Sequence, residues 1–196
     1  MKNFMQLLFY ALLAVTAENV FFAGGIGFSR VLRAARKDKP GLLIYSALLS
    51  GFTLVCSLLT EPLNKMLLQN EDLSFIRPAV FAVVVGSVYI LVVFICKTWF
   101  YKFYQKMDQT FPSAAINSVV LALPFLQNTL KLNIVRTIGF SLGTGVAFFL
   151  AVLIFTQAMV KFQISDMPKS FRGLPTIFLY IGILSMAFIG FTGGKL

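Results

Sequence analysis

The chain has 196 residues, of which 58% are hydrophobic and only 12% are charged. Soluble domains carry about 25% charged residues, so this composition indicates an integral membrane protein. The sequence contains no histidine and two cysteines, which excludes a histidine-ligated zinc site and a Ser-His-Asp triad. We therefore expect no catalytic residue and no metal site built by this chain alone.

Apolar stretches that approach or exceed the length of a membrane-spanning helix, about 20 residues, recur six times along the chain. The segments between them are too short for a soluble domain. The sequence therefore predicts an all-α integral membrane protein that forms one domain over residues 1–196. The predicted spans cover residues 4–28, 41–60, 78–97, 111–127, 136–160 and 174–193.

The net charge of +10 would suggest a nucleic-acid partner in a soluble protein. Here most of the Lys and Arg residues lie in alternate connecting segments, at residues 30–40, 97–109 and 161–172. The positive-inside rule then places these three segments in the cytoplasm and both termini outside, which for a bacterial protein means the plasma (inner) membrane. We expect contact of the basic segments with anionic lipid, and no nucleic-acid partner.

The N-terminal run has a second interpretation. Lys2, the apolar residues that follow it and the small residues before Glu18 are typical of a signal peptide with its cleavage site. The apolar pattern nevertheless continues from Phe22 to Phe28, which favours a membrane span.

The first predicted span contains residues that a lipid-facing helix avoids. A carboxylate such as Glu18 costs about 2.5 to 3.5 kcal/mol in the centre of a span, so it is expected to face protein, water or a partner. Asn19 follows it, and Gly24, Gly25 and Gly27 permit non-helical backbone or close helix packing. The pattern predicts a broken helix, with a plain helix that uses its glycines for packing as the alternative.

The fourth predicted span repeats this pattern. Asn117 follows Asn19 by half the length of the chain, and the short span around it contains Ser118 and Pro124. We expect Pro124 to break this helix as the glycines break the first.

Interrupted segments at matching places in two halves of a membrane protein are typical of inverted repeats with a site at their interface. The sequence therefore predicts two inverted three-helix repeats, about residues 1–105 and 106–196. We expect the shared midplane site to be lined by Glu18, Asn19, Asn117 and Ser118.

The two cysteines, Cys56 and Cys96, are expected to be packing residues. They fall near opposite ends of the second and third spans, so their depths differ by about 20 Å at 1.5 Å per residue. A disulfide requires Cα atoms within about 7 Å, and an iron-sulfur cluster takes four thiolates. The cysteines therefore neither bridge each other nor share a cluster within one chain.

The last third of the chain carries the most recognisable motifs. These are Gly139-Phe140-Ser141, then Pro168-x-x-Phe171-Arg172-Gly173, then Ser-Met-Ala-Phe-Ile-Gly-Phe-Thr-Gly at residues 185–193. Together with the asparagines of the first and fourth spans, they resemble the Rnf/Nqr family of six-helix membrane subunits over the full length. The resemblance is strongest to the A-type subunit of Rnf complexes and its counterpart, the E-type subunit of Nqr.

The resemblance implies a paralogous partner of inverted topology and further Rnf/Nqr-like subunits. It implies a complex that moves electrons between NADH and ferredoxin or quinone while translocating Na⁺ or H⁺. It also implies a [2Fe-2S] cluster held midmembrane by two cysteines from each of two chains. This chain has Gly24 to Gly27 where the first family cysteine is expected and Ser118 where the second is expected. Because a hydroxyl replaces a thiolate poorly, we expect no standard cluster.

The leading hypothesis is a divergent membrane subunit, similar to the A-type subunit of Rnf, in an ion-translocating electron-transfer complex and without catalytic residues of its own. It would pair with a paralogue or with a second copy of itself. Two alternatives stay open: a cofactor-free inverted-repeat transporter or permease, and a structural subunit that helps its partners assemble.

Overall fold

The computed structural model describes residues 2–36, 41–69, 75–107, 110–164, 168–171 and 173–191, and within them the chain is helical with no β-strand. The all-α prediction is therefore confirmed for this part. Its α-helices are α1 (Lys2–Val15), α2 (Phe28–Arg36), α3 (Leu42–Gln69), α4 (Arg77–Trp99), α5 (Tyr101–Met107), α6 (Thr110–Ala115), α7 (Ser118–Thr129), α8 (Ile134–Ile164) and α9 (Leu174–Phe191), with a 3-10 helix, η2 (Lys169–Phe171), before α9.

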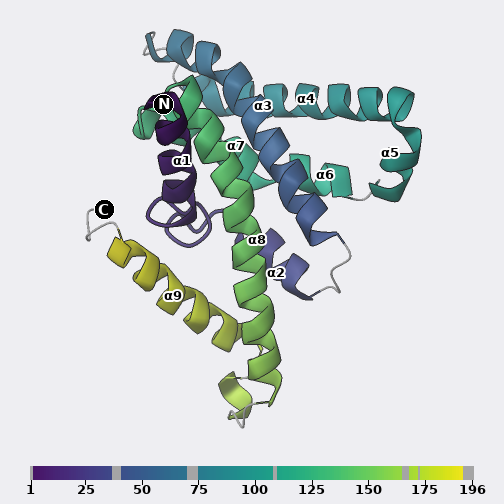
Figure 1. The fold of residues 1–196 in the computed structure, drawn as a ribbon. Helices are drawn as coiled ribbons and strands as arrows, with labels where there is room; N and C mark the ends of the chain where they lie inside the picture. Colours follow the sequence, from purple (N-terminus) through teal and green to yellow (C-terminus); the bar gives the residue numbers. More distant parts are fainter. Residues whose placement is uncertain are drawn as a thin grey trace.

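The two longest helices, α3 and α8, pack against each other at the centre of the fold (Figure 1). The helices α1 and α2 of the first half pack on α8 of the second half, whereas α6 and α7 of the second half pack on α3 of the first half. The broken helices of each half of the sequence thus pack on the long helix of the other half.

Glycines on α8 allow its neighbours to approach closely. A Cβ atom at Gly139 would collide with the carbonyl of Leu7 in α1, and one at Gly143 would collide with the carbonyl of Ala11. A Cβ atom at Gly145 would lie 2.8 Å from a backbone carbonyl oxygen of α3. These three glycines therefore allow close helix packing, because any larger residue would force the helices apart.

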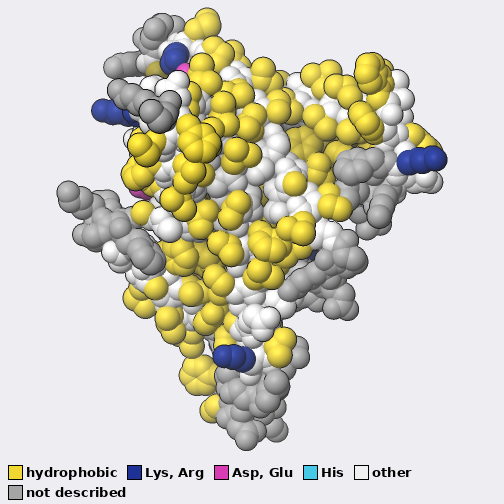
Figure 2. Space-filling model, viewed as in Figure 1, with side chains coloured by type: hydrophobic (Ala, Val, Ile, Leu, Met, Phe, Trp, Pro, Cys, Tyr) yellow, Lys and Arg dark blue, Asp and Glu magenta, His cyan; other side chains and the backbone are white. Residues whose placement is uncertain are grey.

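Four helical segments are long and apolar enough to cross a membrane, and two shorter helices are apolar too. The surface in Figure 2 is accordingly covered by hydrophobic side chains between scattered charges. The four segments are Leu42–Leu68, Arg77–Trp99, Thr110–Thr129 and Ile134–Phe162, and the shorter helices are Asn3–Val15 and Leu174–Gly190. The chain is therefore a multi-pass membrane protein.

The helices α4 and α9 project away from the central pair (Figure 1). Large apolar residues on them are exposed, among them Ile90 and Phe94 on α4 and Ile183 and Met186 on α9. Apolar side chains in such positions suit contact with lipid or with another membrane helix.

Two prolines lie inside helices, contrary to the sequence-based expectation. The second span was predicted to end before Pro62, but α3 continues to Gln69. Pro124 was predicted to break the fourth span, but it lies inside α7. Prolines are tolerated in membrane helices where neighbouring helices satisfy the polar groups of the backbone. Asn64 of α3 also binds α7 at this proline, because its Nδ2 donates to the carbonyl of Pro124 at 3.1 Å.

Candidate functional site

The first helix break covers residues 16–27, between α1 and α2, and Asn19 holds it together. The buried Asn19 side chain accepts hydrogen bonds at Oδ1 from the backbone N–H groups of Phe21 (3.0 Å) and Phe22 (3.1 Å). Its Nδ2 donates to the carbonyl of Val15, the last residue of α1 (2.8 Å). One amide therefore satisfies backbone groups on both sides of the point where the helix stops, which a membrane interior requires.

The residues after Asn19 anchor this break in the core. Phe21 packs edge-on against Phe148 of α8, with ring centroids 5.5 Å apart. Phe22 stacks on Phe188 of α9, with centroids 4.4 Å apart, and lies beside Phe155 of α8. Aromatic pairs at these separations add to the stabilisation from burial, so the non-helical backbone is held in one place.

The second break lies at residues 116–117, between α6 and α7. Asn117 is buried and caps α7, because its Oδ1 accepts from the backbone N–H of Val119 at 3.2 Å. Its Nδ2 donates to the hydroxyl oxygen of Tyr45 in α3 at 3.4 Å, and that hydroxyl donates to the carbonyl of Ser113 in α6 at 2.8 Å. Tyr45 and Asn117 thus link both halves of the broken helix to α3.

The two breaks meet in space. Gly27 has a φ of +81°, and a Cβ atom at this position would lie 2.6 Å from Cγ2 of Val119 and 3.4 Å from Oδ1 of Asn117. Arg30, in the first turn of α2, donates through Nη2 to the carbonyl of Ile116 at 3.3 Å. The last turn of α6 leaves carbonyls without helical partners, and a guanidinium is a favourable donor there.

Among the four predicted site residues, the structure places Glu18 and Asn19 in the first break and Asn117 in the second. Ser118 is the first residue of α7 and is exposed. Glu18 is partly exposed, and its backbone N–H donates to the carbonyl of Leu13. No described residue forms an ion pair with the Glu18 carboxylate. The breaks are brought together by Gly27 and Arg30 rather than by Glu18 and Ser118.

Arg30 and Tyr45 were not among the predicted site residues. Arg30 was assigned to a basic cytoplasmic segment, and Tyr45 to an ordinary span. A partial signal exists in the sequence, since Arg30 lies three positions after Gly27 and is followed by the apolar residues Val31 and Ala35 at helical spacing. Nothing in the sequence around Tyr45 distinguishes it from the other tyrosines of the chain.

The helix-breaking role predicted for the three glycines fits the described backbone. Gly24, Gly25 and Gly27 all lie between α1 and α2, and Gly25 and Gly27 have left-handed φ values of +65° and +81°. Glycine adopts this conformation without the steric cost that other residues meet.

The family motif near the C-terminus forms the connection between α8 and α9. The backbone N–H of Phe171 donates to the carbonyl of Pro168 at 3.0 Å, which closes the turn of η2. Gly173 has a φ of +93°, and its carbonyl accepts from Ile177 in the first turn of α9. Arg172, also part of the motif, lies outside the described residues. In the described residues the motif shapes a turn.

The donors available at the breaks do not fit a thiolate-ligated cluster. The groups there are amides, hydroxyls, backbone carbonyls, the carboxylate of Glu18 and one guanidinium, whereas a [2Fe-2S] cluster takes soft thiolates. Cys56 is buried in α3 and Cys96 lies in α4, so neither belongs to a break. No group of three or more His, Cys, Asp or Glu residues able to hold a metal ion occurs within the part of the chain that the structure describes.

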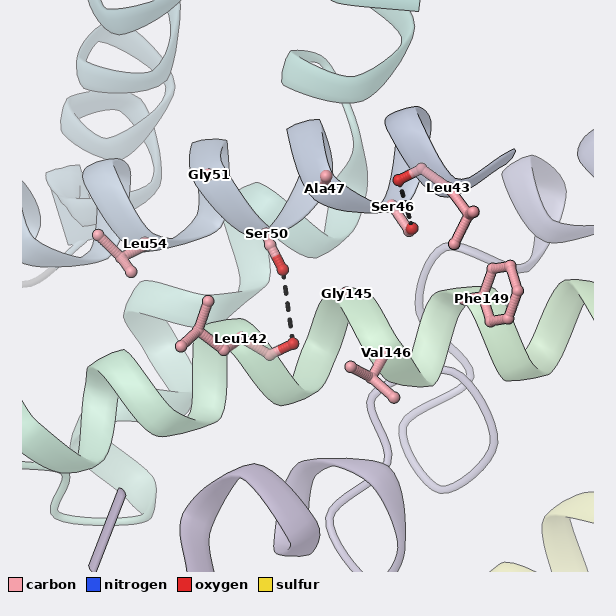
Figure 3. A pocket seen from close by; sticks show the side chains of 10 residues that line it. All are labelled: Leu43, Ser46, Ala47, Ser50, Gly51, Leu54, Leu142, Gly145, Val146 and Phe149. Carbon is pink, nitrogen blue, oxygen red and sulfur yellow. Dashed lines mark hydrogen bonds between the residues drawn. The ribbon is translucent and has the colours of Figure 1, made fainter. Parts of the chain in front are cut away.

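A groove of about 530 Å³ runs between α3 and α8 (Figure 3). Ser50 crosses it and donates from Oγ to the carbonyl of Leu142 at 3.4 Å. Its lining is otherwise apolar apart from Ser46, and it contains no titratable group, so it offers no site for proton transfer. The lining residues are Leu43, Ser46, Ala47, Ser50, Gly51, Leu54, Leu142, Gly145, Val146 and Phe149.

Comparison with known proteins assigns the family. The family model described as "Rnf-Nqr subunit, membrane protein" matches residues 7–194. The A-type subunit of the Na⁺-translocating ferredoxin:NAD⁺ oxidoreductase complex of Acetobacterium woodii is 24% identical over 98% of this chain and 100% of the relative. The A-type subunit of the proton-translocating ferredoxin:NAD⁺ oxidoreductase complex of Clostridium ljungdahlii is 29% identical over 62% of this chain and 63% of the relative.

A relative from an Nqr complex, the other type of complex that the sequence motifs suggested, matches to a similar degree. The E-type subunit of the Na⁺-translocating NADH-quinone reductase of Chlamydia trachomatis is 29% identical over 64% of this chain and 52% of the relative. The matches therefore span from about half to the full length of these relatives. Because the family model covers nearly the whole sequence, the chain belongs to the Rnf-Nqr family of membrane subunits.

Proposed function

We propose that this chain is a divergent membrane component, similar to the A-type subunit of Rnf, of an ion-translocating electron-transfer complex of the NADH/ferredoxin or quinone oxidoreductase type. All three relatives above are named as subunits of such complexes. The observation that carries the proposal is the meeting of two helix breaks, where Gly27 lies against Val119 and Arg30 donates to the carbonyl of Ile116. Paired interruptions of this kind are typical of membrane proteins that move ions.

The proposed architecture is six membrane spans in two inverted three-helix repeats, about residues 1–105 and 106–196. Three features support it. Each half begins with a broken segment that has an asparagine at its break, Asn19 or Asn117. Each broken segment packs on the long helix of the other half, and the last predicted span of each half is a projecting apolar helix, α4 or α9. An odd number of spans per repeat makes the two repeats opposite in orientation.

The proposed partner is a paralogous membrane protein of inverted topology, or a second copy of this chain, together with other Rnf/Nqr-like subunits. The breaks reach the surface, because Gly24, Gly25, Ile116 and Ser118 are exposed. Exposed non-helical backbone in a membrane must be covered by protein or water, so this surface suits the partner.

We also propose that this chain supplies no thiolate to a midmembrane [2Fe-2S] cluster. Gly27 and Ser118 lie at the breaks, and the side chains of Cys56 and Cys96 belong to α3 and α4. Amide and hydroxyl groups hold the break region, and Glu18 offers a carboxylate near it that can bind or release a proton or a cation.

A second candidate function, a cofactor-free transporter module, is favoured by the same oxygen-rich donor set. An inverted-repeat carrier would use the amides of Asn19 and Asn117 to hold its broken helices without any redox group. A third role, in which the chain only assembles its partners, predicts that substitutions at Glu18 have no effect on ion movement.

Purification of the chain from its native membrane with its bound subunits tests the proposed function. We expect subunits that carry redox cofactors to co-purify, and this chain to bind neither iron nor acid-labile sulfide once separated from them. Substrate flux by the chain alone in vesicles, without redox subunits, would support the transporter instead. A stoichiometric [2Fe-2S] signal from the separated chain would contradict the proposal on the cluster.

The Glu18→Gln variant tests the carboxylate. It keeps the shape of the side chain and removes its charge, so we expect a severalfold loss of ion-coupled electron transfer in the intact complex. The matched control is Asp38→Asn, which removes a carboxylate from a predicted cytoplasmic segment. Equal activity of the Glu18→Gln variant and the parent complex would remove the case for this residue.

A further inference from the structure

A second groove, of about 570 Å³, lies between α8 and α9. Few backbone positions of these two helices lie close together within the described residues, and α9 diverges from α8 (Figure 1). Tyr180 of α9 bridges them, because its ring centroid lies 5.6 Å from that of Phe155 and 5.4 Å from that of Phe162, both in α8. The groove is the space beside this aromatic bridge.

The two ends of the groove differ in chemistry. Lys161 and Gln157 lie one turn apart on α8, and both are exposed and line the polar end. Leu153 and Ile154 line the apolar end, about 12 Å from Lys161 along α8 at 1.5 Å per residue. The apolar segment of α8 that can cross a membrane ends at Phe162. Lys161 therefore lies at a membrane surface, and the groove runs from there into the hydrocarbon.

The charge at the polar end is positive and unopposed in the described part of the chain. No described Asp or Glu lines the groove, and no described residue forms an ion pair with Lys161. The segment that begins with this lysine, residues 161–172, contains three cations and one acid. A lysine at a membrane surface extends its ammonium group to the head groups while its stem covers apolar side chains. The polar end therefore suits an anionic head group.

A phospholipid satisfies both ends of the groove at once. Its phosphate matches the ammonium group of Lys161, and its acyl chain matches the apolar end. Basic pockets between membrane helices are known binding places for anionic lipid head groups. A helix of another subunit fits less well, because a membrane-crossing helix is about 30 Å long and would extend far beyond a groove of about 12 Å.

We propose that the groove between α8 and α9 binds one anionic phospholipid, with its phosphate at Lys161 and Gln157 and an acyl chain along Leu153 and Ile154. On the predicted topology this lipid belongs to the cytoplasmic leaflet. General contact of a basic segment with the membrane surface requires no groove. Here a cation and an apolar groove together form a site for a single lipid molecule.

The bound lipid supports the position of α9 beside the first helix break. Phe188 of α9 stacks on Phe22 in that break, with ring centroids 4.4 Å apart. The lipid fills the space between α8 and α9 near the start of α9, and so stabilises a helix that has few backbone contacts of its own. Lipid binding does not rest on the proposed function, although any effect of the lipid on ion-coupled electron transfer does.

Thermal unfolding of the full chain, in detergent and with the subunits it retains, tests the site. Phosphatidylglycerol is compared with phosphatidylcholine of the same acyl chains, so that only the head group differs. At about ten times its Kd, phosphatidylglycerol raises the unfolding midpoint of the parent by about 3 to 6 °C, whereas phosphatidylcholine does not. Lys161→Gln removes the charge and loses most of this rise, and Lys161→Arg keeps it.

The matched control is Lys102→Gln, which removes an exposed cation of α5 in another basic segment and keeps the full rise. Mass spectrometry of the lipid that stays bound through purification gives a second measurement. We expect phosphatidylglycerol bound to the parent chain and a severalfold lower amount bound to Lys161→Gln.

Three results would overturn the site: an undiminished rise in Lys161→Gln, a loss of the rise in Lys102→Gln, or an equal rise with glycerol phosphate, which has no acyl chain. A parent that retains no phospholipid, together with loss of a bound subunit from Lys161→Gln, would assign the groove to a partner helix and also overturn it. Co-purification of redox subunits with the parent does not depend on these results, so the proposed function is tested separately.

Discussion

At Gly27 the chain combines a left-handed backbone with a contact that joins the two breaks. Its φ is +81°, and the space that a side chain would occupy holds Val119, in the first turn of α7 after the second break. Gly25 has a similar φ of +65° but nothing within 4 Å of its would-be Cβ atom. Comparing the same substitution at these two glycines therefore separates the free-energy cost of the backbone conformation from the cost of packing between the breaks.

Gly27→Ala is expected to lower the free energy of unfolding by about 3 kcal/mol, of which about 1 to 2 kcal/mol is backbone strain and the rest is overpacking. Gly25→Ala is expected to cost about 1 kcal/mol, because only the backbone term applies. Unfolding in detergent, followed by circular dichroism, measures both. Equal losses in the two variants would show that the contact between the breaks contributes nothing.

The individual residues also show which contacts can be predicted from the local sequence and which cannot. Asn19 and Asn117 are recognisable because a polar amide in an apolar run is costly unless it serves the backbone, and both do so. Arg30 and Tyr45 act on Ile116 and Asn117, which are more than 70 positions away in the sequence. No local pattern encodes a partner at that separation.

At the scale of elements, α1 packs closely on α8 directly before the first break. Gly139 and Gly143 sit one turn apart on α8 and lie against the backbone of α1 at Leu7 and Ala11. Helices in a membrane gain little from hydrophobic burial against each other, so close backbone approach and dispersion contacts stabilise this pair.

Gly143→Ala is expected to destabilise the chain by about 2 kcal/mol, because its methyl group collides with the carbonyl of Ala11 and pushes α1 away. The control is Gly182→Ala in α9, where nothing lies within 4 Å of the would-be Cβ atom. That change is expected to be neutral or to stabilise by up to about 1 kcal/mol through helix propensity. Thermal unfolding compares them, and an equal effect of both would argue against tight packing of α1 on α8.

At the scale of the whole molecule, the proposed inverted repeat makes a claim about orientation. Six spans with basic segments at residues 30–40, 97–109 and 161–172 put those segments inside and both termini outside. Four segments meet the length and hydropathy needed to cross a membrane alone, whereas Asn3–Val15 and Leu174–Gly190 are shorter. The first crossing then depends on α1 together with the break that follows it, at residues 16–27.

Reporter fusions test this topology in the bacterial membrane. Green fluorescent protein is expected to fluoresce when fused after residue 38 or 166, and alkaline phosphatase is expected to be active when fused after residue 132 or after Leu196. A fluorescent fusion at Leu196 would place the C-terminus inside and exclude six spans with an external N-terminus.

The sequence alone determined the membrane character and the family, and it singled out the two asparagines of the broken segments, although it placed the second break at Pro124 rather than at residues 116–117. These properties follow from local chemistry: apolar runs, loop charges, short motifs, and amides or glycines in spans where they are costly. Only the tertiary structure showed that the breaks meet through Gly27 and Arg30. It also showed that Pro62 and Pro124 lie within continuous helices. Those facts depend on which helices, distant in the sequence, pack together. The hydrophobicity of a helix can be read from its own residues, whereas the helix it packs against cannot.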